Sequence, residues 1–217
     1  FKLLKGDKGM FNPDELKYAI NPKNFYHAPL TKLVSLENTT NKGGGHCWDV
    51  NQFEKIKKIC DENELGLHMD GARVWNSIVA KNNNPELYGN YFDTISVCLS
   101  KGLGCPVGSI LVGKKKFIDK ALRIRKILGG GMRQVGYLAA AGLYALENNL
   151  QRLSVDHQKA KEIASRFSSK DCIKSVNEVE TNIIILELND SLEKQKMINH
   201  FSEKEIIFDW YSMGLKK

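Results

Sequence analysis

The sequence lacks apolar runs long enough to cross a membrane, and its cysteines form no recognisable motif. Uncharged stretches such as Val135–Leu146 are far shorter than the roughly 18 apolar residues that a membrane-spanning helix needs. The five cysteines contain no C-x-x-C pair, which argues against a zinc ribbon and against a disulfide framework. We therefore expect no membrane span, no metal site and a reducing, cytoplasmic compartment.

The chain carries an excess of positive charge but no basic tract. Lys and Arg number 32 against 25 Asp and Glu, so the net charge is +7 and the pI is about 9.1. A basic protein invites a nucleic-acid interpretation. However, the lysines are spread along the chain, so solvated surface lysines are the favoured interpretation and no nucleic-acid partner is expected.

Strand-like and helix-like segments alternate along the chain, which predicts an α/β fold with helices on the faces of a sheet. The expected strands are a strand-like tail at 2–8 and the segments 32–37, 66–69, 94–99, 109–113, 182–187 and 205–209. The expected helices are a short one beginning at Asn12-Pro13 and the segments 49–63, 72–81, 116–128, 135–148, 152–167 and 191–202. The helix-rich middle predicts a boundary near residue 150. Residues 1–150 would form a large domain and residues 151–217 part of a smaller α/β domain.

Polar residues follow three of the predicted strands at their carboxyl ends, where α/β sheets bind ligands. These segments are Glu37-Asn38-Thr39, Asp70-Gly71-Ala72-Arg73 and Ser100-Lys101-Gly102. Alone, Asp70 is typical of a helix cap or turn, and Lys101 is typical of a surface loop. Together they are what pyridoxal 5'-phosphate requires. A lysine amine forms a Schiff base with its aldehyde, and an aspartate keeps its pyridine nitrogen protonated.

A dinucleotide-binding loop is the competing interpretation of the glycines that follow Lys101. Gly102, Gly104 and Gly108 approximate G-x-G-x-x-G, but the third glycine is one residue late. The segment also leads into the predicted strand 109–113, so a pyrophosphate would find no helix N-terminus there. The dinucleotide interpretation is therefore rejected.

Long motifs follow one another in order along the chain. They are Ser35-Leu36-Glu37-Asn38-Thr39, His68-Met69-Asp70-Gly71-Ala72-Arg73, the run 96–104 with Pro106-Val107-Gly108, Arg125-Lys126, and Gly129-Gly130-Gly131-Met132-Arg133-Gln134. These motifs closely resemble those of the low-specificity L-threonine aldolases. That family consists of fold-type-I pyridoxal-phosphate enzymes, and the β-eliminating lyases are its neighbours. The resemblance implies a three-layer αβα large domain followed by the start of a small α/β C-terminal domain.

The resemblance also implies roles for single residues. Lys101 would bind the cofactor covalently, and Asp70 would pair with the pyridine nitrogen. Arg73 would contact the cofactor and help to hold the substrate carboxylate. His27 matches a family histidine near the substrate hydroxyl, where it is a candidate to place a water or take the hydroxyl proton.

The implied reaction is the retro-aldol cleavage of L-threonine or L-allo-threonine to glycine and acetaldehyde, in glycine biosynthesis and threonine catabolism. The implied assembly is a homodimer or homotetramer. Lys126 and Arg133 match basic residues near the site that can serve a neighbouring subunit, and Asn38 is a candidate cofactor contact.

Some positions depart from the family pattern. Thr40 stands where many members have a histidine, and a small effect is expected. The family's phosphate-gripping loop, its ring-stacking residue and its C-terminal carboxylate-binding arginine find no counterpart in a chain that starts at Phe1, which suggests a fragment. Two alternatives therefore stay open. One is a truncated, inactive remnant or subunit-interaction protein, and the other is a related pyridoxal-phosphate β-eliminating lyase.

Overall fold

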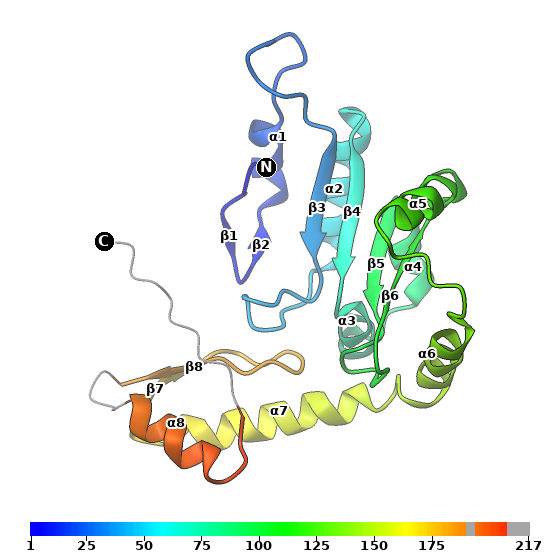
Figure 1. Ribbon diagram of the computed structural model, residues 1–217. Helices are drawn as coiled ribbons and strands as arrows, with labels where there is room; N and C mark the ends of the chain where they lie inside the picture. Colours follow the sequence, from blue (N-terminus) through cyan, green and yellow to red (C-terminus); the bar gives the residue numbers. More distant parts are fainter. Residues whose placement is uncertain (190–193, 208–217) are drawn as a thin grey trace.

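The computed structural model describes residues 1–189 and 194–207, and a four-stranded sheet lies at its centre (Figure 1). The strands lie in the order β3-β4-β5-β6, where β3 is Leu33–Glu37, β4 is Gly66–Gly71, β5 is Thr94–Cys98 and β6 is Ser109–Gly113. The first three run parallel, and β6 is antiparallel to β5. All four lie where strands were predicted, so the α/β class is confirmed.

Helices connect the parallel strands. α2 (Val50–Glu62) joins β3 to β4, while α3 (Val74–Lys81) and α4 (Pro85–Tyr91) join β4 to β5. α4 was not predicted, because seven residues are too few to show a helical period. Its start nevertheless has a cap signal, since the Asn84 side chain accepts the backbone N–H of Glu86 at 3.0 Å.

The first helix begins in the same way. The Asn12 side chain accepts the backbone N–H of Asp14 at 3.0 Å, and α1 (Pro13–Ala19) follows. Before it, the predicted strand at 2–8 is reduced to β1 (Gly6–Asp7), which pairs antiparallel with β2 (Met10–Phe11).

The main core lies between α2 and one face of the sheet. Phe53 and Ile56 of α2 are fully buried, as are Leu67 and Met69 of β4. Burial of each such side chain contributes about 2 kcal/mol. This explains why apolar residues alternate along the strands and recur at helical spacing in α2.

The opposite face of the same sheet is polar. Neighbouring side chains along a strand point to opposite faces, so the residues between the core positions gather here. They are Ser35, Glu37, His68, Asp70, Thr94, Ser96 and Cys98, all exposed or half-buried. We call this set the polar face.

β6 forms one edge of the sheet. Within the described residues it pairs only with β5. Its apolar side chains Ile110, Leu111 and Val112 are 41–45% exposed.

Helices dominate after β6, as predicted. α5 is Lys115–Ile127, α6 is Gly136–Asn148, and the long α7 is Leu153–Ser168. Figure 1 shows α7 crossing beneath the carboxyl ends of the strands, with the β7–β8 hairpin and α8 at its far end. None of the helices in 1–189 and 194–207 is both long and apolar enough to span a bilayer.

The C-terminal elements differ from expectation in detail. β7 (Ile173–Val176) was not predicted, and β8 (Leu186–Leu188) is shorter than the strand expected at 182–187. α8 (Lys194–Ser202) confirms the helix expected at 191–202, of which 191–193 lie outside the described residues. In place of the strand expected at 205–209, residues 205–207 form a turn and irregular chain, and 208–209 lie outside the described residues.

The predicted domain boundary near residue 150 falls between α6 and α7 and stays a proposal. α7 packs on α3, where Nε2 of His157 lies 3.1 Å from Nδ2 of Asn76, and both side chains are buried. Burial lowers the pKa of His157, so its neutral ring accepts the amide proton of Asn76.

Candidate active site

Asp70 lies at the carboxyl end of β4 with its carboxylate exposed. Its Oδ1 accepts the backbone N–H of Ala72 at 3.0 Å, which is the turn-forming contact expected of an aspartate before glycine. Its neighbours in the ladder are Glu37 of β3 and Ser96 of β5. Within the described residues its second oxygen, Oδ2, has no protein partner, so the carboxylate can bind a ligand from the polar face.

The residue after Asp70 has to be glycine. A Cβ on Gly71 would lie 2.8 Å from the backbone oxygen of Ser96 and 2.9 Å from the side chain of Ile95. The close approach of β4 and β5 at this point therefore depends on the missing side chain.

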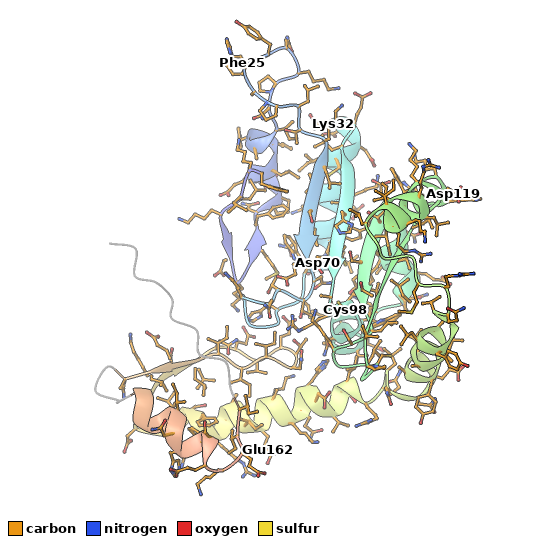
Figure 2. All side chains as sticks on the ribbon, viewed as in Figure 1. Phe25, Lys32, Asp70, Cys98, Asp119 and Glu162 are labelled. Atoms are coloured by element: carbon orange, nitrogen blue, oxygen red, sulfur yellow. The ribbon has the colours of Figure 1, made fainter. Side chains whose placement is uncertain are left out.

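Lys101 lies in the loop that follows β5, and its side chain is exposed. The amine Nζ lies 3.4 Å from Sγ of Cys98, the last residue of β5. Cys98 stands one polar-face position beyond Ser96, the ladder partner of Asp70. Figure 2 shows Asp70 and Cys98 at the same end of their strands. The structure thus brings the predicted carboxylate and amine to one edge of the sheet.

The loop that carries Lys101 is fixed at both ends. The N–H of Leu99 donates to the oxygen of Gly108 at 3.0 Å, and the amide of Asn149 donates to the oxygen of Leu103 at 2.8 Å. Gly104 has a φ of +78°, a conformation that side chains other than glycine's seldom adopt. The glycines around Lys101 therefore shape the loop.

Arg73 lies three residues after Asp70 and is half-buried at the start of α3. Within the described residues its guanidinium makes no hydrogen bond or ion pair with protein groups. The positive charge is therefore available to an anionic ligand beside Asp70.

Asn38 has a structural position. It is fully buried, its amide donates to Oγ of Ser77 at 3.0 Å, and its Oδ1 accepts the N–H of Trp48 at 3.3 Å. The side chain thus ties the loop after β3 to α3 and offers no exposed atom to a cofactor.

His27 lies apart from the other candidates. It is exposed in the loop that leads into the amino end of β3, where its ring lies 3.9 Å from that of Tyr26. Figure 2 shows this loop, marked by Phe25 and Lys32, at the opposite end of the sheet from Asp70. Within one chain, the structure does not bring His27 to Asp70 or Lys101.

Lys126 and Arg133 are exposed as well, at the end of α5 and in the loop after it. α5 follows β6, whose last residue, Gly113, pairs with Thr94 at the amino end of β5. The helix therefore starts at the end of the sheet away from Asp70.

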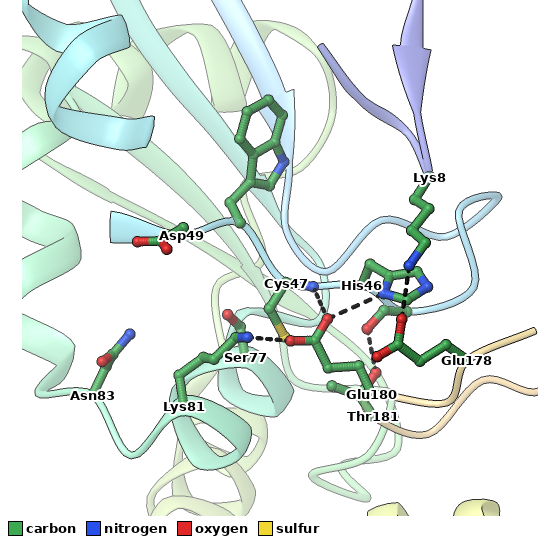
Figure 3. A network of polar contacts seen from close by, with 12 residues as sticks. Lys8, His46, Cys47, Asp49, Ser77, Lys81, Asn83, Glu178, Glu180 and Thr181 are labelled. Carbon is green, nitrogen blue, oxygen red and sulfur yellow. Dashed lines mark hydrogen bonds and ion pairs between the residues drawn. The ribbon is translucent and has the colours of Figure 1, made fainter. Parts of the chain in front are cut away.

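A polar network that the sequence did not predict joins the segment between β7 and β8 to the loop after β3 and to the end of α3 (Figure 3). Glu180, from the segment between β7 and β8, accepts the backbone N–H of Cys47 at 2.8 Å through Oε2. Nδ1 of His46 donates to the same oxygen at 3.2 Å, and Lys81 at the end of α3 forms an ion pair with the other. Because these residues lie more than 90 positions away from Glu180 along the chain, no sequence spacing pointed to the network.

The surroundings of Glu180 and of the Cys47 thiol shift the pKa of both groups. Burial acts to raise the pKa of Glu180, but the hydrogen bonds from Lys81 and Cys47 and the charge of Lys81 outweigh it. The pKa of Glu180 is therefore below its ordinary value. Burial raises the pKa of the Cys47 thiol to about 12, so Cys47 is a structural thiol at neutral pH.

Comparison with known proteins places these features in a family. The profile of the family described as beta-eliminating lyase matches residues 1–191. The chain is 40% identical to low-specificity L-threonine aldolase 1 of Arabidopsis thaliana, over 95% of this chain and 59% of that protein. It is 41% identical to the low specificity L-threonine aldolase of Escherichia coli K12, over 82% of this chain and 51% of that protein. The chain thus spans about half the length of the curated relatives it matches.

Solved structures share the fold. A putative L-allo-threonine aldolase from Listeria monocytogenes superposes with a TM-score of 0.79 at 23% identity, over 97% of this chain and 57% of that one. Threonine aldolase from Leishmania major superposes with a TM-score of 0.69 at 19% identity, over 94% of this chain and 57% of that one. A PLP-dependent aminotransferase from Streptococcus suis also matches, with a TM-score of 0.64 at 14% identity. The expected fold type is thereby confirmed.

Proposed function

The chain belongs to the beta-eliminating lyase family, and from this membership we propose that its protein cleaves L-threonine and L-allo-threonine to glycine and acetaldehyde with pyridoxal 5'-phosphate. The observation that carries the proposal is the placement of Asp70 at the carboxyl end of β4 and of Lys101 in the loop after the neighbouring parallel strand β5. In α/β sheets this edge is where ligands bind.

The donor set fits the two reactive ends of the cofactor. Asp70 offers a carboxylate oxygen without a protein partner to the pyridine nitrogen, and Lys101 offers an exposed amine to the aldehyde. Pyridoxal phosphate would supply an electron-accepting ring. Asp70 would hold its ring nitrogen, and Lys101 would hold its aldehyde end.

Arg73 is the candidate partner of the substrate carboxylate. It follows Asp70 by three residues and brings a guanidinium, whose planar fork matches a carboxylate. Binding there would orient the amino acid in the site.

His27 is proposed as the group that places a water at the substrate hydroxyl or takes its proton. Because His27 lies at the other end of β3, this role requires a second copy of the chain to bring it to the site. Assembly as a homodimer or homotetramer is supported by exposed apolar side chains on the helices after β6. They include Leu122, Ile124, Ile127, Tyr137, Leu143 and Tyr144. Lys126 and Arg133 lie on the same part of the chain and could serve the site of a neighbouring subunit.

A cytoplasmic location is proposed from the cysteines. Cys47, Cys60, Cys98, Cys105 and Cys172 are all free thiols, which suits a reducing compartment.

The test is a cleavage assay on the full-length protein that contains this chain, loaded with pyridoxal phosphate. We expect acetaldehyde release from L-threonine and L-allo-threonine, and borohydride trapping of the cofactor on the peptide that contains Lys101. Cofactor binding without cleavage would support the inactive remnant instead. Cleavage of an aromatic amino acid in preference to threonine would support a related lyase.

A further inference from the structure

His68 lies two residues before Asp70 in β4. Because one residue separates them, their side chains point to the same side of the sheet, which is the polar face. The register with β5 places Thr94 beside His68 and Ser96 beside Asp70. These four residues form two adjacent rows on the polar face, and the row of Asp70 and Ser96 is the one nearer to the loop of Lys101.

The imidazole of His68 is held at both nitrogens by hydroxyl groups of β5. Nδ1 lies 2.9 Å from Oγ1 of Thr94, and Nε2 lies 3.4 Å from Oγ of Ser96. The ring is half-buried, whereas its strand neighbours Leu67 and Met69 are in the core on the other face. His68 therefore contacts polar groups on the polar face and does not fill the core.

Ser96 links this ring to Asp70. The two residues are ladder partners, and neighbouring strands lie about 4.8 Å apart. Oδ1 of Asp70 is engaged by the N–H of Ala72. Within the described residues Ser96 and Asp70 make no direct hydrogen bond. Their register places both side chains on the polar face of neighbouring strands, and the Ser96 hydroxyl has His68 as its partner.

We propose that His68 is a positioning residue for Asp70, acting through the hydroxyl of Ser96. When the Thr94 hydroxyl donates to Nδ1, the Nε2–H donates to Ser96, and the hydroxyl proton of Ser96 stays available. In the proposed arrangement of the cofactor-loaded site, Ser96 donates this proton to Oδ2 of Asp70 on the neighbouring strand. Such a hydrogen bond would fix the direction in which the Asp70 carboxylate points. An oriented carboxylate is what the pyridine nitrogen needs, so the inference rests on the proposed function and adds two residues to it.

The experiment measures the dissociation constant of pyridoxal phosphate and the pH dependence of the visible absorption of the bound cofactor. It uses the full-length holoprotein and its His68→Leu, Ser96→Ala and double variants. We expect each single variant to weaken cofactor binding about tenfold, as the loss of a hydrogen bond to a charged group does. The double variant should be no worse than the singles, because both remove the same connection.

His68→Gln and His157→Leu provide the controls. The glutamine amide can still reach Ser96, so binding should return to within about threefold of the unchanged protein. His157→Leu removes the hydrogen bond to Asn76 away from the polar face, so it should lower thermal stability without changing cofactor affinity. If His68→Leu does not fold, Ser96→Ala and His68→Gln carry the test.

Three results would overturn the inference. The first is a cofactor affinity within twofold of that of the unchanged protein for both single variants. The second is a double variant in which the losses of affinity of the two single variants multiply, and the third is a loss of cofactor affinity in His157→Leu equal to that in His68→Leu. An unchanged protein that binds no pyridoxal phosphate would overturn the proposed function, and the inference with it.

Discussion

Cys47 and Glu180 are joined by a 2.8 Å hydrogen bond from the backbone N–H of Cys47 to Oε2 of Glu180, although 133 positions separate them in the chain. Lys81 and His46 bind the same carboxylate. One side chain thus fastens the segment between β7 and β8 to α3 and to the loop after β3. Because Lys81 is the last residue of α3, this contact holds the carboxyl end of that helix.

Replacing Glu180 should weaken the fold. Glu180→Gln removes a charged acceptor from three donors, and we expect the free energy of unfolding to fall by about 2 kcal/mol. Urea unfolding followed by circular dichroism measures this loss. Glu178→Gln is the matched control, because its ion pair with Lys8 is exposed and contributes little. An equal loss in both variants would contradict the role assigned to Glu180.

The lowered pKa of Glu180 predicts that the stability of the fold depends on pH. The pKa of Glu180 in the folded protein is below its ordinary value of 4.5. Its contribution is therefore complete above about pH 4.5 and is lost as the pH falls through the lower, folded value. Unfolding measured from pH 7 downward should show this loss in the unchanged protein and a smaller one in Glu180→Gln. If the free energy of unfolding falls equally with pH in the two proteins, Glu180 is not the source of the pH dependence.

Replacing Gly71 and Gly89 by alanine should change the stability of the fold in opposite directions. Gly71→Ala places a methyl group 2.8 Å from the oxygen of Ser96, so β4 and β5 must separate, at a cost of about 2 kcal/mol. Gly89 lies in α4 with nothing within 4 Å of the added carbon, so Gly89→Ala should stabilise by up to about 1 kcal/mol. Thermal unfolding of both variants checks the prediction, and a stable Gly71→Ala protein would show that the strands can part freely.

Lys101→Ala should abolish the borohydride-reducible cofactor adduct. The amine is the only group in the proposed site that can form the Schiff base, so both trapping and cleavage should disappear. Mass spectrometry of the reduced protein provides the readout, with the exposed Lys120 of α5 as the comparison position. Lys120→Ala should keep the adduct, and normal turnover by Lys101→Ala would refute the proposed mechanism.

Asp70→Asn should separate binding from chemistry. The amide keeps the size of the side chain and can still accept the N–H of Ala72, so the strand end should survive. Without the carboxylate charge the ring nitrogen is no longer held protonated, and kcat/KM should fall about 100-fold or more. Steady-state kinetics with L-threonine measures this fall, and an unchanged rate would assign the ring-nitrogen contact to another residue.

The sequence was sufficient where a local pattern decides the structure. The alternating residues of β3, β4 and β5 predicted the sheet, and the polar residues at the ends of β4 and β5 pointed to Asp70 and Lys101. α4 and β7 are too short to show a period, and tertiary packing decides whether such segments form. His27 was expected near the site because of the family resemblance. It precedes β3 and therefore lies at the amino end of that strand, whereas Asp70 and Lys101 lie at the carboxyl ends of theirs. Glu180 was missed because its partners are brought to it only by the fold.

The edge of the sheet has a practical consequence for handling this polypeptide. Within the described residues, the outer backbone groups of β6 face no strand, and Ile110, Leu111 and Val112 lie open beside them. Such an edge is a template on which another extended chain can add, including one from a neighbouring molecule. Expression of residues 1–217 alone should therefore favour precipitation, and a charged residue in place of Leu111 would keep the isolated polypeptide in solution.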